Sequence, residues 1–169
     1  MSILPQYRVG IGHDTHRLVA GDHLQLGLQL GGVRVPTDRA FVAHSDGDVL
    51  IHAVIDALLG AASLGDIGEL FSDQDPANRG RDSAEMLAQV KRLLDENRWQ
   101  IVNLDCIVFL QKPKLGPYKE AIRTRLAAIL GLEPGQVGVK AKTGEGVGHI
   151  GREEAAAAEC VALLGKTSI

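Results

Sequence analysis

Apolar positions along the chain recur with the two periods that distinguish strands from helices. The two-residue period predicts three strands, over residues 7–12, 99–111 and 136–143. The first of them is expected to break into a glycine-rich turn. Alternating leucines between residues 24 and 36 predict a hairpin that turns at Gly31 and Gly32.

The first helical segment is rich in valine, leucine, isoleucine and alanine. It is expected to start at a cap formed by Ser45 or Asp46 and to run to about Leu59. Residues 64–81, which follow it, are rich in glycine, aspartate and proline and have no period. A connection of this length inside one domain suggests a functional loop.

Two further helices have clear end signals. Asp82 followed by Glu85 is a capping pattern for the second helix. The third is expected to open at Pro117 and to close at Gly131. Residues 153–164 are so rich in alanine and glutamate that helix propensity alone predicts a helix there.

Strands that alternate with helices suggest one layer of helices packed on one sheet. The chain has 169 residues, of which 45% are hydrophobic, and this length corresponds to a single domain, residues 1–169. The apolar content excludes a disordered chain, and no apolar run is long enough to span a membrane.

The charge pattern narrows the possible partners. The net charge is −3 and only 4% of residues are aromatic. Without basic blocks or stacking side chains, nucleic-acid binding is disfavoured. Cys106 and Cys160 are expected to be reduced core residues in a cytoplasmic protein.

Two clusters of acids and histidines suggest a metal site. Asp14 and His16 are two residues apart after a strand, so an extended backbone places both side chains on one side. Asp48, His52 and Asp56 follow one another at four-residue steps and share one face of the first helix. The alternative interpretations are a solvated turn for the first pair and a satisfied core histidine for His52.

Asp14, His16 and His52 would make a set of three oxygen and nitrogen ligands. Three protein ligands leave the fourth tetrahedral position open, which is typical of catalytic zinc. Asp48 and Asp56 would then orient the imidazole of His52.

Two loops could bind the rest of a substrate. Residues 43–48 lead into the first helix, where free N–H groups suit a phosphate and where His44 and Ser45 could donate. Simple capping of the helix is the alternative. Residues 65–75 could bind sugar hydroxyls or close over a site, and could equally be a solvated connection.

A third loop, residues 140–152, contains glycines at the G-x-G-x-x-G spacing of dinucleotide-binding folds. Only 18 residues follow Gly151, too few to complete a βαβ unit, so this interpretation is excluded. A loop suited to a diphosphate and a divalent cation held by Glu145 remains. A glycine hairpin with surface charges is the alternative.

In this order the motifs resemble the 2-C-methyl-D-erythritol 2,4-cyclodiphosphate synthase family over nearly the whole chain. The resemblance is carried by Arg8-Val-Gly-Ile-Gly-His-Asp14-Thr-His16-Arg17, by Ala43-His-Ser-Asp-Gly-Asp-Val-Leu-Ile-His52-Ala-Val-Ile-Asp56-Ala-Leu-Leu-Gly-Ala, by Leu64-Gly-Asp-Ile-Gly68, by Pro113-Lys114 and by residues 140–152.

The resemblance implies an enzyme of the non-mevalonate (MEP) isoprenoid pathway. Its substrate is 4-diphosphocytidyl-2-C-methyl-D-erythritol 2-phosphate, whose 2-phosphate attacks the diphosphate to give the cyclic diphosphate and CMP. By resemblance, one zinc ion per active site would bind Asp14, His16 and His52, and Glu145 would hold Mg2+ or Mn2+ on the diphosphate. His44 and Thr143 would act in catalysis.

The resemblance also implies a substrate-binding set. It comprises Asp14, His16, His44, Ser45, Asp66, Ile67, Gly68, Phe71, Ser72, Asp73, Gln74, Asp75, Leu110, Gln111, Lys112, Pro113, Lys114, Leu115, Gly116, Lys142, Thr143, Gly144, Glu145, His149 and Arg152. Among these, Leu110–Gly116 and Lys142–Gly144 would form the cytidine pocket. His149 and Ser72 depart from the family pattern, which commonly has an aromatic residue and a proline there.

The fold that the resemblance implies is a two-layer α+β sandwich. It has one mainly four-stranded mixed sheet, helices on one face and a small hairpin, and it forms a homotrimer with active sites at subunit interfaces. In this fold the C-terminal segment is a strand, and we expect a strand there despite its helix propensity. Two alternative functions stay open: another zinc-dependent phosphoryl-transfer or hydrolytic enzyme, and a non-catalytic trimeric module that binds isoprenoid diphosphates.

Overall fold

Five strands form the main sheet of the computed structural model, in the order β4-β1-β7-β5-β6. The strands are β1 (Gln6–Ala20), β4 (Arg39–Val42), β5 (Gln100–Phe109), β6 (Val137–Lys142) and β7 (Ala155–Lys166). Only the β5–β6 pair is parallel. The structure describes residues 6–20, 27–43, 45–72 and 74–166, so the predictions for His44 and Asp73 and for the start of the hairpin lie outside it.

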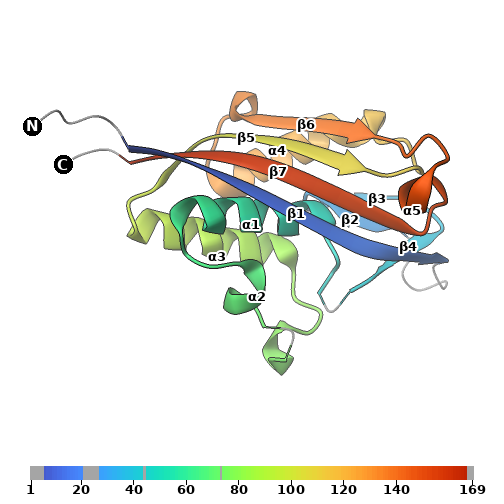
Figure 1. Cartoon of the computed structure of the whole chain (residues 1–169), viewed down its shortest axis with the longest axis horizontal. Coiled ribbons are helices and arrows are strands. Elements are labelled where there is room, and N and C mark those ends of the chain that lie inside the picture. The colour runs from blue at the N-terminus through green and yellow to red at the C-terminus, as the bar shows by residue number, and fades with distance from the viewer. Residues whose placement is uncertain (1–5, 21–26, 44, 73, 167–169) are drawn as a thin grey trace, which may run out of the picture.

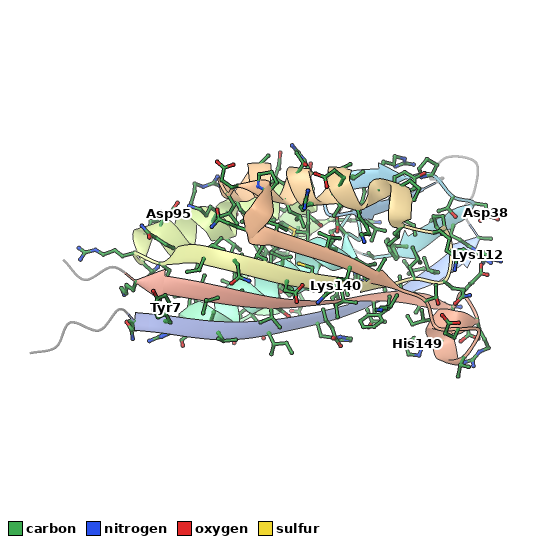
Figure 2. The ribbon with its side chains drawn as sticks, turned by 90° about the horizontal axis from the view of Figure 1, so that it is seen from above. Tyr7, Asp38, Asp95, Lys112, Lys140 and His149 are labelled. Carbon is green, nitrogen blue, oxygen red and sulfur yellow. The ribbon has the colours of Figure 1, made fainter. Side chains whose placement is uncertain are left out.

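Three long helices cover one face of this sheet (Figures 1 and 2). They are α1 (Val49–Ala62), α3 (Ser83–Glu96) and α4 (Lys119–Leu130). Short helices α2 (Ile67–Leu70) and α5 (Gly148–Gly151) lie in connections, and 3₁₀ turns lie at Pro76–Asn78, Gly116–Tyr118 and Pro134–Gln136. None of the helices among the described residues has the length and apolar character needed to cross a membrane.

The predicted α+β class is confirmed, but the main sheet has five strands rather than four. The additional strand is β4, which pairs with the end of β1 between Arg17 and Ala20. The hairpin is confirmed over β2 (Leu28–Leu30) and β3 (Val33–Val35), with the turn at Gly31 and Gly32.

β1 differs most from its prediction, because it continues unbroken through Gly10 and Gly12. A Cβ atom on Gly10 would lie 2.0 Å from the carbonyl oxygen of Ala57, and one on Gly12 would lie 2.0 Å from that of Ala53. These glycines therefore do not form a turn; they let the backbone of β1 approach the backbone of α1.

The N-terminus of α1 was predicted two or three residues too early, at Ser45 or Asp46. Its cap is Asp48, which is fully buried and accepts a hydrogen bond from the Ile51 N–H at 3.0 Å. The same carboxylate accepts from the backbone N–H groups of Gly31 at 2.9 Å and Gly32 at 2.7 Å. Asp48 thus ties the hairpin turn to the start of the helix and takes no part in orienting His52, contrary to the prediction.

We expect Asp48→Ala to lower the free energy of unfolding by about 3 kcal/mol or more, because it leaves three backbone donors without their acceptor. Asp82→Ala is the matched control, since that cap accepts from the single exposed Ala84 N–H and should cost only about 1 kcal/mol. Urea denaturation of both variants measures the difference. Equal losses would contradict the role given to Asp48.

The predicted ends at Asp82 and Gly131 are confirmed, and the predicted start at Pro117 is displaced. Asp82 caps α3, and α4 ends at Gly131 in the left-handed conformation. Pro117 lies in the 3₁₀ turn that precedes α4, so the helix itself begins two residues after the proline.

The C-terminal segment is a strand, as the resemblance predicted and as helix propensity did not. β7 lies between β1 and β5, so both of its edges are hydrogen-bonded. Its small inward side chains are buried against α1: Ala156, Ala158, Cys160 and Ala162. Cys106 lies opposite Cys160, with the two sulfur atoms 3.6 Å apart; both are buried and unbridged, as predicted.

The face of the sheet away from the helices carries apolar side chains in solvent. Tyr7, Val9 and Ile11 of β1 are 59%, 69% and 71% exposed, and Val161 lies beside Ile11 on β7. Monomeric proteins seldom leave a contiguous apolar surface uncovered, so this face has the character of an interface.

Candidate active site

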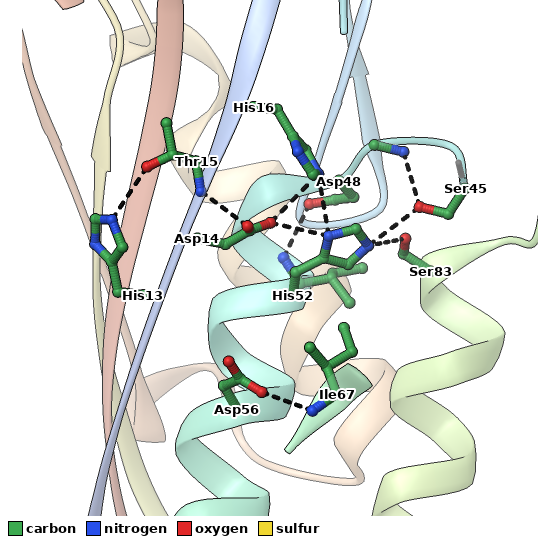
Figure 3. Close-up of polar contacts among 12 residues, drawn as sticks. His13, Asp14, Thr15, His16, Ser45, Asp48, His52, Asp56, Ile67 and Ser83 are labelled. Atoms are coloured by element: carbon green, nitrogen blue, oxygen red, sulfur yellow. Dashed lines mark hydrogen bonds and ion pairs between the residues drawn. The ribbon is translucent and has the colours of Figure 1, made fainter. Parts of the chain in front are cut away.

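Three side chains meet where β1 passes the first turn of α1 (Figure 3). The Oδ2 atom of Asp14 lies 2.9 Å from Nδ1 of His52 and 3.3 Å from Nε2 of His16. The two histidine nitrogens are 3.1 Å apart. Ligands of a tetrahedral zinc ion, each about 2.0–2.2 Å from the metal, lie roughly 3.3–3.5 Å from one another. The triad therefore fits a metal with only small side-chain movements.

The strand and the helix each place their part of the triad. Asp14 and His16 point to the helix side of β1, while the alternate residues His13 and Thr15 lie on the other face, where they contact each other. The β7 residues paired with Asp14 and His16 are alanines, which leave room for the two larger side chains.

Burial and the neighbouring charges set the protonation of the triad. Burial lowers the pKa of His16 below its ordinary value, and this outweighs the opposing effect of the Asp14 carboxylate. Burial also acts to lower the pKa of His52, but the hydrogen bond that Asp14 accepts from it and the charge of Asp14 more than offset this, so this pKa is raised. Burial acts to raise the pKa of Asp14, and the two histidines reverse this, so Asp14 remains an anion that could bind a metal ion.

The second ring nitrogen of His52 faces hydroxyl groups. Its Nε2 atom lies 3.0 Å from Oγ of Ser83 and 3.2 Å from Oγ of Ser45. The predicted partners are wrong, because Asp48 caps α1 and Asp56 accepts from the backbone N–H of Ile67 at 2.8 Å. Asp56 thereby fixes the start of α2 beside the site.

The triad opens into a cavity of about 260 Å³. Its walls come from β1, β4, α1, α2, α3 and the connection after α2. Besides the triad they comprise Val42, Ala43, Ser45, Ile67, Gly68, Phe71, Asn78 and Met86.

A second cavity, of about 200 Å³, lies between the ends of β5 and β6 and the start of α4. Its walls comprise Leu110, Lys114, Leu115, Gly116, Lys119, Ala141, Lys142 and Thr143. The three lysines give it a positive rim suited to an anionic group.

The glycine-rich loop after β6 folds back on itself. A Cβ atom on Gly144 would lie 2.4 Å from the Gly151 nitrogen, so the loop needs glycine for close packing. Thr143 donates its hydroxyl proton to Glu145 at 2.6 Å. The chain then enters the antiparallel strand β7, which agrees with the exclusion of a dinucleotide-binding unit.

A family model described as the YgbB family matches residues 7–165. The chain belongs to the YgbB family. It is 51% identical over 154 residues to the 2-C-methyl-D-erythritol 2,4-cyclodiphosphate synthase of Gemmatimonas aurantiaca. The aligned region covers 91% of this chain and 89% of the relative.

Solved structures agree with this membership of the YgbB family. A 2C-methyl-D-erythritol-2,4-cyclodiphosphate synthase in a CDP-bound form has a TM-score of 0.84 at 38% identity, covering 93% of this chain and 99% of that one. The bifunctional IspDF from Campylobacter jejuni has a TM-score of 0.91 at 37% identity. This chain covers 44% of its length, so it corresponds to one part of that larger protein.

In this YgbB family chain, the structure distributes the predicted site residues over two places. Around the metal triad it gathers Ser45, Ile67, Gly68 and Phe71. Around the second cavity it gathers Leu110, Lys114, Leu115, Gly116, Lys142 and Thr143. Gln111 accepts from the Gly144 N–H at 3.1 Å and so supports the second cavity from outside.

The remaining predicted residues line neither cavity, as far as the described residues show. Asp66 caps α2 by accepting from Glu69, and Ser72 accepts from the N–H of Gln74. All of these remaining residues lie in the connections between the strands and the long helices: Asp66, Ser72, Gln74, Asp75, Lys112, Pro113, Gly144, Glu145, His149 and Arg152. Arg152 pairs with Glu154, and Lys112 pairs with Glu153.

Sequence analysis missed Ser83, Asn78 and Met86 beside the triad and Lys119 beside the second cavity. Ser83 is the first residue of α3 and is fully buried. The cap at Asp82 gave the position of the helix, but a contact with His52, 31 residues earlier in the chain, left no local signal.

Proposed function

We propose that this YgbB family chain converts 4-diphosphocytidyl-2-C-methyl-D-erythritol 2-phosphate into 2-C-methyl-D-erythritol 2,4-cyclodiphosphate and CMP. The observation that carries the proposal is the convergence of Asp14, His16 and His52 on one cavity, in a chain 51% identical to a relative of that name. The reaction makes the chain a phosphorus–oxygen lyase of the non-mevalonate pathway, with the cytoplasmic location predicted from the sequence.

The reaction needs positioning more than covalent chemistry. An oxygen of the 2-phosphate attacks the nearer phosphorus of the diphosphate, and the bond from that phosphorus to the bridging oxygen breaks. The bridging oxygen leaves with CMP and keeps the electron pair. Water does not take part, so the cavity must keep the attacking phosphate in line and exclude solvent.

The donor set of the triad suits zinc, since one carboxylate and two imidazoles leave a fourth position for substrate. Zinc bound there would polarise a phosphate oxygen and offset its charge. The hydroxyl of Ser45 faces the same cavity and would orient that phosphate. Phe71, Ile67 and Gly68 would hold the methylerythritol, and His44 would assist catalysis.

The second cavity would bind the cytidine end of the substrate. Its lysine-lined rim suits phosphate oxygens, and Leu115 and Gly116, which also line it, would contact the base. We propose that Glu145 holds Mg2+ or Mn2+ on the diphosphate, with Thr143 beside it as a group that supports the transition state.

We propose a homotrimer with active sites at the interfaces. Two features support it: the triad cavity and the cytidine cavity have no lining residue in common, and the sheet face around Tyr7, Val9 and Ile11 is apolar and uncovered. A neighbouring subunit could cover that face and bring its cytidine cavity to the triad of the first.

Product analysis tests the activity. The chain is incubated with zinc, Mg2+ and the cytidine-diphosphate substrate, and products are read by 31P NMR and mass spectrometry. The cyclic diphosphate with CMP is the expected result. Release of inorganic phosphate would instead indicate a hydrolase, and tight binding without turnover would indicate a non-catalytic module.

The role of Glu145 can be tested separately. Glu145→Gln should raise the Mg2+ concentration needed for half-maximal turnover by about tenfold, because a neutral amide is a weaker ligand for a hard cation. Bound zinc should stay unchanged. Glu120→Gln on α4 removes a surface carboxylate far along the chain from this loop and is the control. An unchanged Mg2+ requirement in Glu145→Gln would refute the second metal site.

A further inference from the structure

A hydrogen-bonded chain runs from Asp46 through Ser83 to the ring of His52. Ser83 donates its hydroxyl proton to Oδ1 of Asp46, and its backbone N–H donates to Oδ2 of the same carboxylate at 3.1 Å. On the other side Oγ of Ser83 lies 3.0 Å from Nε2 of His52. Ser83 is fully buried and its contact with His52 is buried too, so water does not compete at that contact, while Asp46 is half-buried.

The donors available at each contact fix the direction of the hydrogen bonds that run from Asp46 through Ser83 to His52. A carboxylate has no proton to give, so Asp46 can only accept and the single proton of the Ser83 hydroxyl is committed to it. Towards His52 the oxygen of Ser83 can then only accept. Nε2 of His52 must therefore carry a proton, whichever form the rest of the ring takes.

Asp46 is held in place for this role. It accepts from the backbone N–H of Asp48 at 3.3 Å, and its own N–H donates to the carbonyl oxygen of Arg81 at 3.2 Å. These contacts join the segment before α1 to the segment before α3. The carboxylate is thus positioned by the two connections that converge on the site.

Asp14 favours the other tautomer of His52, with the proton on Nδ1. Its Oδ2 atom lies 2.9 Å from Nδ1, and a neutral ring with its only proton on Nδ1 would satisfy that carboxylate. Such a ring would present N–H instead of a lone pair to a metal, and Nε2 would face Ser83 without a proton. The position of the proton on His52 therefore decides whether the triad is ready for a cation.

We propose that Asp46 and Ser83 are a positioning pair that keeps the proton of neutral His52 on Nε2, so that Nδ1 offers its lone pair to the metal beside Asp14 and His16. This inference deepens the proposed function and rests on it for the identity of the metal. Neither residue lines the triad cavity; both act through the ring of His52. Partners of this kind typically change metal affinity 10–100-fold.

The pair has a consequence for Ser45. Its Oγ atom accepts from the backbone N–H of Gly47 at 3.2 Å and can accept from Nε2–H of His52 at the same distance. With the Gly47 N–H donating and the single Nε2–H of His52 shared between Ser83 and Ser45, the hydroxyl proton of Ser45 is left for the cavity, where it can donate to a phosphate oxygen.

Zinc affinity of the full-length chain, measured against a fluorescent chelator with zinc alone, tests the pair. Ser83→Ala should weaken zinc binding about 10–100-fold. Asp46→Asn should weaken it similarly, because the amide can donate to Ser83 and release the hydroxyl proton towards Nε2. The double variant should lose no more than the stronger single variant, since both residues act in one chain of bonds.

Asp82→Ala is the matched control, because it removes the exposed cap one residue from Ser83 and leaves the pair intact. It should lower the stability of α3 and keep zinc affinity within twofold. Zinc affinity within twofold of the parent in both Ser83→Ala and Asp46→Asn would overturn the proposal, as would fully additive losses in the double variant.

A spectroscopic readout separates positioning from general destabilisation. In metal-free protein at about pH 9, 15N NMR of the neutral His52 ring should show the proton on Nε2, and the variants should shift it towards Nδ1. A neutral ring protonated on Nδ1 in the parent chain would refute the pair. If the expected tautomer and zinc losses are found but no cyclic diphosphate forms, the proposed function fails and the positioning pair stands.

Discussion

His52→Ala will leave the chain without bound zinc and without measurable formation of the cyclic diphosphate. The substitution removes one of three ligands and leaves Asp14 and His16 alone on one strand. Lewis-acid polarisation of a phosphate contributes several kcal/mol to the transition state, so turnover should fall at least about a thousandfold. Metal content and product formation are measured on the same preparation, with the oligomeric state checked by light scattering.

Val54→Ala is the matched control for His52→Ala. It shortens a fully buried side chain of the same helix two residues further on, and it should cost about 1–3 kcal/mol of stability without loss of metal or turnover. The zinc assignment is wrong if His52→Ala retains stoichiometric metal, or if Val54→Ala loses the metal to the same degree.

Gly12→Ala should prevent the native packing of α1 on the sheet. The new Cβ atom would lie 2.0 Å from the Ala53 carbonyl oxygen and 2.6 Å from the Ala57 nitrogen. Both are backbone atoms, so no rotamer change can relieve the contact and the whole helix would have to move. We expect a loss above about 4 kcal/mol, a large fraction of the roughly 5–15 kcal/mol that holds a domain folded.

Gly60→Ala, in α1, is expected to have the opposite effect on stability. A Cβ atom there has no neighbour within 4 Å, and the residue is exposed in α1. Relieving the entropy cost of glycine in a helix should stabilise the chain by about 0.5–1 kcal/mol. Urea denaturation followed by circular dichroism compares the two, and a Gly12→Ala variant within 1 kcal/mol of the parent would contradict the close approach of β1 and α1.

Features with local causes could be predicted from the sequence. The cap at Asp82, the helix end at Gly131 and the hairpin turn at Gly31 each depend on a few neighbouring residues, and each is present in the structure. The candidate metal triad could be assembled from two short motifs, because a two-residue step on a strand pointed to Asp14 and His16 and a polar face on the first helix pointed to His52. The resemblance to a known family implied the same three residues.

Features that depend on distant residues were not predictable in this way. The glycines of β1 have the composition of a turn, and only the backbone of α1 against them shows why they lie in a strand. β7 has the composition of a helix, but its position between two strands supplies hydrogen bonds to both edges and overrides propensity. Asp48 and Ser83 likewise act on partners 16–17 and 31 residues away.

Outward and inward side chains alternate along β1. Odd-numbered residues from Tyr7 to Ile11 form the apolar outer face, and Asp14 and His16 belong to the inner set that lies against α1. A slip of the whole strand by one residue against β7 would exchange the two sets, turning Asp14 and His16 outward and the apolar side chains into the helix layer. Insertion or deletion of a single residue between Ile11 and Asp14 would instead put the two sets on the same face. Substitutions can alter the outer face and the triad separately, but such a change in length would leave only one of them correctly placed.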